Sequence, residues 1–141
     1  MGLYDHWREA APIRNRLKVL AGEGAINCGT VNLWTDPKAS SDCVLKAYKT
    51  RKPFFALYDT QEVSIDSRFI DGLAGDNLGN LYDVEFSSMG WSTQRRIGEI
   101  QLTDGGYILV EPCPKPVTLT RSVYKGMTCI PRIMASTNER K

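Results

Sequence analysis

The spacing of apolar positions predicts helices in the first third of the chain and strands in the remainder. Over 4–21 the apolar residues recur at helical spacing, with Pro12 between the two halves. Proline is tolerated in a first helical turn and is costly inside a helix, so we expect a kink at Pro12 or a main helix that begins there. Gly22 ends this segment, and alternation over 26–33 predicts a short strand.

The clearest helix signal follows Trp34, which leads into a turn. Thr35-Asp36-Pro37 combines side-chain oxygens that can cap a helix with a proline suited to the first helical position. Cys43, Val44 and Ala47 then mark one apolar face. Pro53 prevents continuation, so we predict a principal helix over 37–51 with Cys43 on its buried side.

From Pro53 onward the period changes to two, which is typical of strands. Tyr82, Val84 and Phe86 are predicted to point inward, whereas Asp83 and Glu85 are predicted to face water. Glycine, aspartate and asparagine between 72 and 80 predict a turn. The predicted extended segments are 54–59, 63–70, 81–86, 97–102 and 107–110, followed by a last hairpin over 117–133.

This order of elements predicts an α+β fold. We expect a mainly antiparallel sheet of about six strands, packed on one face by the principal helix, with an additional N-terminal helix. A cystatin-like arrangement is the first expectation. We expect a single domain over 1–141, with a helical segment at 4–21, a core at 26–133 and a flexible tail at 135–141.

Charge is distributed unevenly along the chain. The net charge is +2, but it divides into +3 over 1–60, −6 over 61–111 and +5 over 112–141. The folded surface is therefore either dipolar or an ordinary mixture of charges. No apolar run approaches the roughly 18 residues of a membrane span, so we expect none.

Four cysteines, Cys28, Cys43, Cys113 and Cys129, stand apart rather than in metal-binding pairs. His6 is the only histidine, which argues against zinc and leaves disulfides or free buried thiols. Three pairings are open. We prefer Cys28 with Cys43 and Cys113 with Cys129, because each closes a loop of about 15 residues, which stabilises by about 3 kcal/mol in the chain-entropy model.

Disulfides imply an extracytoplasmic location, periplasmic or secreted. The N-terminus lacks the pattern of a secretory signal, so we expect that a native signal peptide has been removed and that Met1-Gly2 was introduced for expression. A cytosolic origin is the rival interpretation. Mass mapping of the cysteines without reduction would distinguish the two.

Few residues are candidates for chemistry. No Ser-His-Asp arrangement or nucleotide-binding glycine loop is present, and we expect no cofactor and no metal. Two carboxylates among Asp59, Glu62 and Asp66 could perform acid/base hydrolysis. Oxygen-bearing residues over 71–83 miss the spacing of a calcium loop and are better explained as a turn.

Two predicted surfaces are candidates for binding. One is the segment 59–67, with Tyr58 and Gln61 as contact residues, and the other is the predicted loop around Trp91, where an exposed aromatic ring could anchor a partner or fold back on the sheet. Cations near the C-terminus could neutralise phosphates, but their sparse spacing argues against nucleic acid; they are Lys115, Arg121, Lys125 and Arg132, accompanied by Tyr124.

The chain resembles a family of small uncharacterised exported bacterial proteins with a Cys-Gly…Cys…Cys-Pro…Cys pattern. The resemblance spans about 26–131 and implies a two-disulfide extracytoplasmic domain without implying an activity. Glu62-Val63-Ser64 departs from the shorter link expected there. The motifs that carry it are Asn27-Cys28-Gly29, Cys43-Val44 with Ala47, Pro53-Phe54-Phe55, Tyr58-Asp59-Thr60-Gln61, Asp66-Ser67, Cys113-Pro114 and Cys129-Ile130-Pro131.

The sequence therefore predicts a non-enzymatic binding or inhibitor-type domain with a protein partner. A small hydrolase that uses a carboxylate pair is the alternative from another class. A weak polyanion or nucleic-acid binder that uses the C-terminal hairpin is the third.

Overall fold

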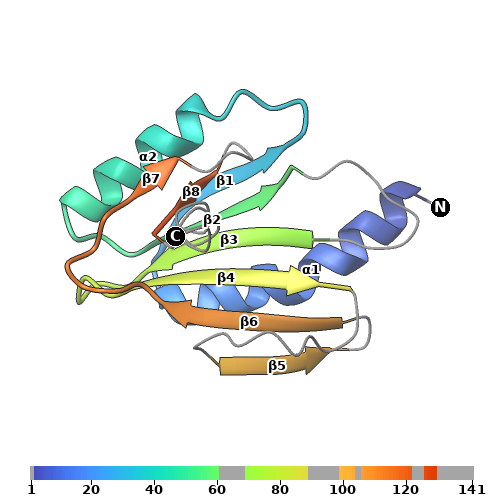
Figure 1. Ribbon diagram of the computed structural model, residues 1–141. Helices are drawn as coiled ribbons and strands as arrows, with labels where there is room; N and C mark the ends of the chain where they lie inside the picture. The colour runs from blue at the N-terminus through green and yellow to red at the C-terminus, as the bar shows by residue number, and fades with distance from the viewer. Residues whose placement is uncertain (1, 61–68, 89–98, 104–105, 122–125, 130–141) are drawn as a thin grey trace, which may run out of the picture.

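A computed structural model describes residues 2–60, 69–88, 99–103, 106–121 and 126–129. The described residues form two helices and a mostly antiparallel sheet, and all elements after the second helix are strands (Figure 1). The elements in order are α1 (Gly2–Ala21), β1 (Ile26–Asn32), α2 (Lys38–Lys49), β2 (Phe54–Asp59), β3 (Phe69–Gly75), β4 (Leu81–Ser87), β5 (Glu99–Thr103), β6 (Gly106–Pro112), β7 (Thr120–Arg121) and β8 (Met127–Thr128).

The main sheet has six strands in the order β1-β2-β3-β4-β6-β5. β1 runs parallel to β2, with α2 as the connection between them, and all other neighbours are antiparallel. β7 and β8 form a separate two-stranded sheet. The predicted α+β class with about six mainly antiparallel strands is confirmed, and the last hairpin is not part of the main sheet.

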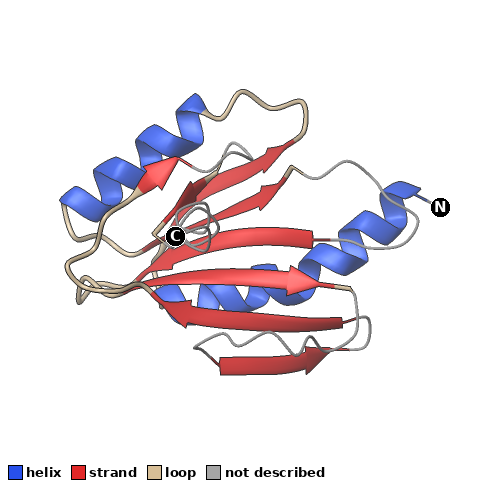
Figure 2. Ribbon diagram, in the orientation of Figure 1, coloured by secondary structure: helices blue, strands red, loops and turns tan. Residues whose placement is uncertain are grey.

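One face of the sheet is covered by α1. Ile13 and Leu17 are fully buried and pack against Ile70, Val84 and other apolar side chains of the central strands. α1 is one helix that continues through Pro12, so the alternative of a main helix beginning at Pro12 is wrong. Figure 2 shows this helix behind the sheet.

The opposite face is covered by α2 and the β7–β8 hairpin. Side chains alternate along β2, so that Phe55 and Leu57 face α1 whereas Phe54 and Ala56 face α2. Val44 and Ala47 are the buried residues of α2 against this face. Helices pack on both faces, which the sequence did not predict, and the comparison with cystatins is not confirmed.

The strand β3 extends through a stretch that was predicted to be a turn. Gly72 and Gly75 lie inside it because neighbouring side chains occupy the space that a Cβ would need. A Cβ on Gly72 would lie 2.6 Å from Leu17 Cδ1, and one on Gly75 would overlap the Phe54 ring. These glycines permit close approach of a side chain from each face. The turn itself spans Asp76 to Asn80.

The prediction that Asp83 faces water is wrong. Asp83 is 3% exposed and accepts a hydrogen bond from Thr128 Oγ1 at 2.6 Å. Glu85, which was also predicted to face water, is half-buried. Alternation was correct, but the second face is covered by the C-terminal hairpin, whose position a period-two pattern does not reveal.

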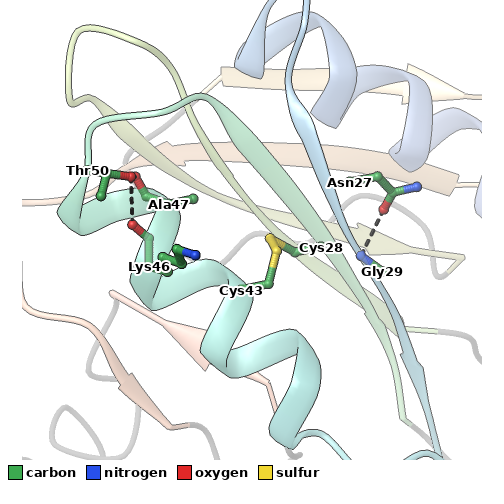
Figure 3. The surroundings of a disulfide bond; sticks show 7 residues. All are labelled: Asn27, Cys28, Gly29, Cys43, Lys46, Ala47 and Thr50. Carbon is green, nitrogen blue, oxygen red and sulfur yellow. Dashed lines mark hydrogen bonds between the residues drawn. A yellow bond between two sulfur atoms is a disulfide. The ribbon is translucent and has the colours of Figure 1, made fainter.

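Both predicted disulfides are present. Cys28–Cys43 joins β1 to α2 across a Cα–Cα distance of 5.5 Å, and Figure 3 shows this bridge between strand and helix. Cys113–Cys129 joins the exit from β6 to the residue after β8, with a Cα–Cα distance of 5.6 Å. In the described part of the chain, no helix is long and apolar enough to cross a membrane.

Candidate binding surface at the Trp34 end of the sheet

The sheet has two ends that carry different connections. β1, β2 and β4 finish at one end, where β3 begins. The loop from β1 to α2 is also at this end (Figure 1). The opposite end carries the β3–β4 turn and the carboxyl end of α2. β1 and β2 end side by side at Asn32 and Asp59, and the exposed Trp34 follows in the loop from β1, so we take this end as the candidate binding surface.

Among the residues that the structure describes, Trp34 is the most exposed large apolar one. It lies just after β1 and is 87% exposed. Burial of a large apolar side chain contributes about 1.5–3 kcal/mol, and an indole exposed in the free protein can gain this free energy only by contact with a partner. Exposed tryptophans of this kind are typical anchors of protein interfaces.

The loop that carries Trp34 is fixed by hydrogen bonds around Asn32. The Asn32 side-chain oxygen accepts from the Trp34 backbone N–H at 2.9 Å and from Thr35 Oγ1 at 2.6 Å. The Asn32 backbone N–H donates to Thr35 Oγ1 at 3.2 Å, and the Thr35 N–H donates to the Asn32 carbonyl at 3.1 Å. The backbone below the indole is thus held in one conformation.

Directly after this loop, Asp36 and Pro37 precede α2, which begins at Lys38. The Asp36 carboxylate accepts from the Lys38 backbone N–H at 3.0 Å, and Pro37 occupies the position before the first helical residue. Lys38 forms an ion pair with Asp42 at 2.8 Å, and hydrogen bonding to that carboxylate raises the pKa of Lys38. The charged groups here are therefore compensated locally, and the indole is the dominant feature.

The predicted site residues divide into described and undescribed ones. Tyr58 is 4% exposed, and its ring packs against Gly126, so it belongs to the core beneath the hairpin. Asp59 is half-buried at the end of β2, opposite Asn32 in the register. The other predicted contact and catalytic residues, Gln61, Glu62, Asp66 and Trp91, lie outside the described residues.

The sequence predicted that Trp34 leads into a turn, but Trp34 was not among the predicted contact residues. The signal was available, because a tryptophan followed by Thr-Asp-Pro stands in a turn with no apolar periodicity to bury it. Trp91 was selected instead because glycine and serine flank it. Exposure, which singles out Trp34 among the described residues, is not a property of local sequence.

The described residues were also compared with the ligand sets that hold metal ions. In the described ranges, no group of three or more His, Cys, Asp or Glu side chains is arranged to hold a metal ion. Of the C-terminal cations, Lys115 contacts the β3–β4 turn through Asn80 Oδ1 at 3.3 Å, whereas Lys125 and Arg132 lie outside the described residues.

Fold and cross-links together define a two-disulfide α+β domain with a six-stranded sheet covered on both faces. Comparison of the chain with protein-family models, with curated proteins and with solved structures gave no match.

Proposed function

We propose that this protein is a non-enzymatic extracytoplasmic binding domain that contacts a protein partner through the Trp34 loop. The observation that carries the proposal is an indole 87% exposed on a loop fixed by four hydrogen bonds. A rigid anchor loses little conformational entropy when it binds, so more of its burial contributes to affinity.

The two disulfides support the extracytoplasmic part of the proposal. Such bonds persist in oxidising compartments and are rare in the reducing cytosol. Alkylation of protein isolated from the native host, followed by peptide mass mapping without reduction, tests this point. We expect Cys28–Cys43 and Cys113–Cys129 intact, and four alkylated thiols would overturn the location.

The binding test compares two exposed apolar residues. Immobilised wild type, Trp34→Ala and Leu102→Ala are incubated with periplasmic and secreted proteins of the host, and retained proteins are quantified by mass spectrometry. Leu102 is the matched control because it is 74% exposed but lies on the edge strand β5. We expect a protein retained by wild type and Leu102→Ala and depleted by about tenfold with Trp34→Ala.

Calorimetry with the purified partner then measures the change in Kd directly. Equal retention by all three proteins, or equal losses with both variants, would contradict the proposal. The fold of each variant is checked by its thermal unfolding, since an exposed side chain is expected to change stability by no more than about 0.5 kcal/mol.

A further inference from the structure

A cavity of about 390 Å³ lies at the other end of α2 from the Trp34 loop. Three separate parts of the chain line it: the carboxyl end of α2, the β3–β4 turn and the segment after β6. Volumes of this order are typical of sites for small molecules. The cavity shares no residue with the Trp34 loop, so its role is independent of the proposed function.

The charged residues that line the cavity are all cationic. Lys49 and Arg51 come from the end of α2, and Lys115 approaches from the segment after β6. Asp76 is in the adjoining turn, where its carboxylate accepts hydrogen bonds from the backbone N–H of Leu78 at 2.9 Å and of Asn80 at 3.0 Å. Its negative charge also interacts with Lys115 and offsets part of the positive charge, but the cations outnumber it. The lining therefore favours an anion.

The backbone of Arg51 adopts a conformation that normally favours glycine. Its φ is 58°, the one positive φ among the described residues other than glycine. The Lys52 N–H donates to the Ala47 carbonyl at 2.9 Å and the Arg51 N–H to that of Tyr48 at 3.1 Å. This is the Schellman pattern, in which glycine commonly occupies the position of Arg51.

Arginine at this position is therefore costly to the fold, and residues held in such conformations cluster at functional sites. The side chain lies over the β3–β4 turn, where a Cβ on Gly79 would be 3.3 Å from Arg51 Nη1. The absence of a side chain at Gly79 leaves space for the guanidinium at the cavity wall. Arg51 therefore keeps an unfavourable backbone conformation, and the space above Gly79 admits its guanidinium.

The lining also indicates which anion fits. A guanidinium forms paired hydrogen bonds with phosphate or carboxylate oxygens, and lysines add point charges. The positive charge that remains after Asp76 offsets part of that of Lys115 matches a doubly charged group better than a single carboxylate. Tyr48 is half-buried at the wall and Leu78 is 73% exposed beside it, so an organic substituent would find apolar surface next to the charges. We propose that this cavity binds a phosphate monoester that carries an apolar or aromatic group.

The test titrates full-length protein with phenyl phosphate, inorganic phosphate and benzoate, observed by amide chemical shifts in NMR. We expect shifts at Arg51, Gly79 and Lys115, with phenyl phosphate bound about tenfold more tightly than either of the other two, because only it provides both dianion and ring. Binding should weaken as salt concentration rises. Absence of saturable shifts with phenyl phosphate would overturn the proposal.

Variants separate a built site from general surface charge. Arg51→Gly removes the guanidinium and relieves the backbone, and we expect it to weaken phenyl phosphate binding by about tenfold without lowering the unfolding temperature. Lys46→Ala is the matched control, because Lys46 is an exposed cation of α2 that does not line the cavity. Equal weakening by Arg51→Gly and Lys46→Ala would overturn the site.

A phosphate monoester could be a soluble metabolite or a lipid headgroup. Flotation with phosphatidylcholine vesicles, with and without phosphatidic acid, distinguishes these sources once phenyl phosphate binds. Retention that requires both phosphatidic acid and Arg51 would identify a lipid ligand at this cavity. Binding of phenyl phosphate without retention on vesicles would identify a soluble ligand at the same cavity.

Discussion

The core under α1 consists of apolar side chains, whereas the core under α2 includes both disulfides and borders on a buried carboxylate. α1 has 20 residues and packs mainly on the central strands, whereas α2 has 12 and packs mainly on β1 and β2. A short helix over the edge of a sheet buries less apolar surface, and covalent cross-links compensate for that deficit.

This difference also locates the candidate functions. The Trp34 loop precedes α2, and the strained Arg51 follows its end, so both candidate surfaces belong to the cross-linked layer. A strained residue lowers the stability of a fold, and a cross-linked layer tolerates that loss. The α1 layer supplies the scaffold. Four predictions test this division between the layers.

The largest expected effect belongs to the α1 layer. Leu17→Ala should lower the free energy of unfolding by about 3–4 kcal/mol, because it removes a fully buried side chain and leaves a cavity above β3. Chemical denaturation measures this change. Val19→Ala is the control on the same helix, since Val19 is 70% exposed and should change stability by less than about 0.5 kcal/mol.

Gly72 provides an internal check on that result. Gly72→Ala alone should destabilise because its new Cβ meets Leu17 Cδ1. In the double variant the space vacated by Leu17 accommodates the methyl group, so the combined loss should be smaller than the sum by about 1 kcal/mol. If the losses in unfolding free energy of the two single variants simply added, Leu17 and Gly72 would not be energetically coupled, and the proposed contact between α1 and β3 would be wrong.

Removal of a disulfide should have the next largest effect, and a local one. The bridges span sequence separations of 15 and 16 residues, so the chain-entropy model gives each about 3 kcal/mol. We expect Cys28→Ala/Cys43→Ala to reduce amide-exchange protection in α2 more than in α1. Equal loss of protection in both helices would contradict the division of the molecule into two layers.

Much of this architecture was predictable because the period of the apolar residues is local. The predicted cap differed, since Pro37 is the N-cap residue and not the first helical residue. The α2 segment, both disulfides and the alternation of β2 and β4 follow from the spacing of apolar residues, cysteines and proline. The last hairpin was predicted over 117–133, and within that range Thr120 pairs with Thr128 and Arg121 with Met127.

The missing predictions concern contacts between distant segments. Gly72 appeared to belong to a turn. The contact that excludes a larger residue there is with the Leu17 side chain, which lies 55 residues earlier in the sequence. Asp83 appeared to face water because the hairpin that covers it comes much later in the chain. The cavity is likewise formed by three separate segments, so no local sequence motif predicts it.

A smaller effect of opposite sign is expected at Arg51. Arg51→Gly should raise the free energy of unfolding by about 0.5–1 kcal/mol, because glycine adopts a positive φ without the steric cost that arginine incurs. Lys52→Gly is the control at the next position, where φ is not positive, and should destabilise by about 0.5 kcal/mol. A destabilised Arg51→Gly would show that the guanidinium contributes to the fold and would weaken the argument from strain.

The smallest effect concerns the pH dependence of the turn beside the cavity. Burial alone would raise the pKa of Asp76, but hydrogen bonds from Asn80 and Leu78 and the charge of Lys115 outweigh it and hold the pKa below its ordinary value of 3.8. A carboxyl whose pKa is lower in the folded state stabilises the fold above its unfolded pKa, and that contribution is lost as pH falls through the folded value.

Asp76→Asn keeps an oxygen that can accept both backbone N–H groups but removes the charge. The wild type should therefore exceed the variant by about 0.5 kcal/mol near pH 7, a small difference because the turn is partly exposed to solvent. Denaturation at a series of pH values should show the difference vanish below about pH 3–4. A difference that persists unchanged to lower pH would assign the effect to turn geometry, and the charge of Asp76 would then play no part in balancing the cations of the cavity.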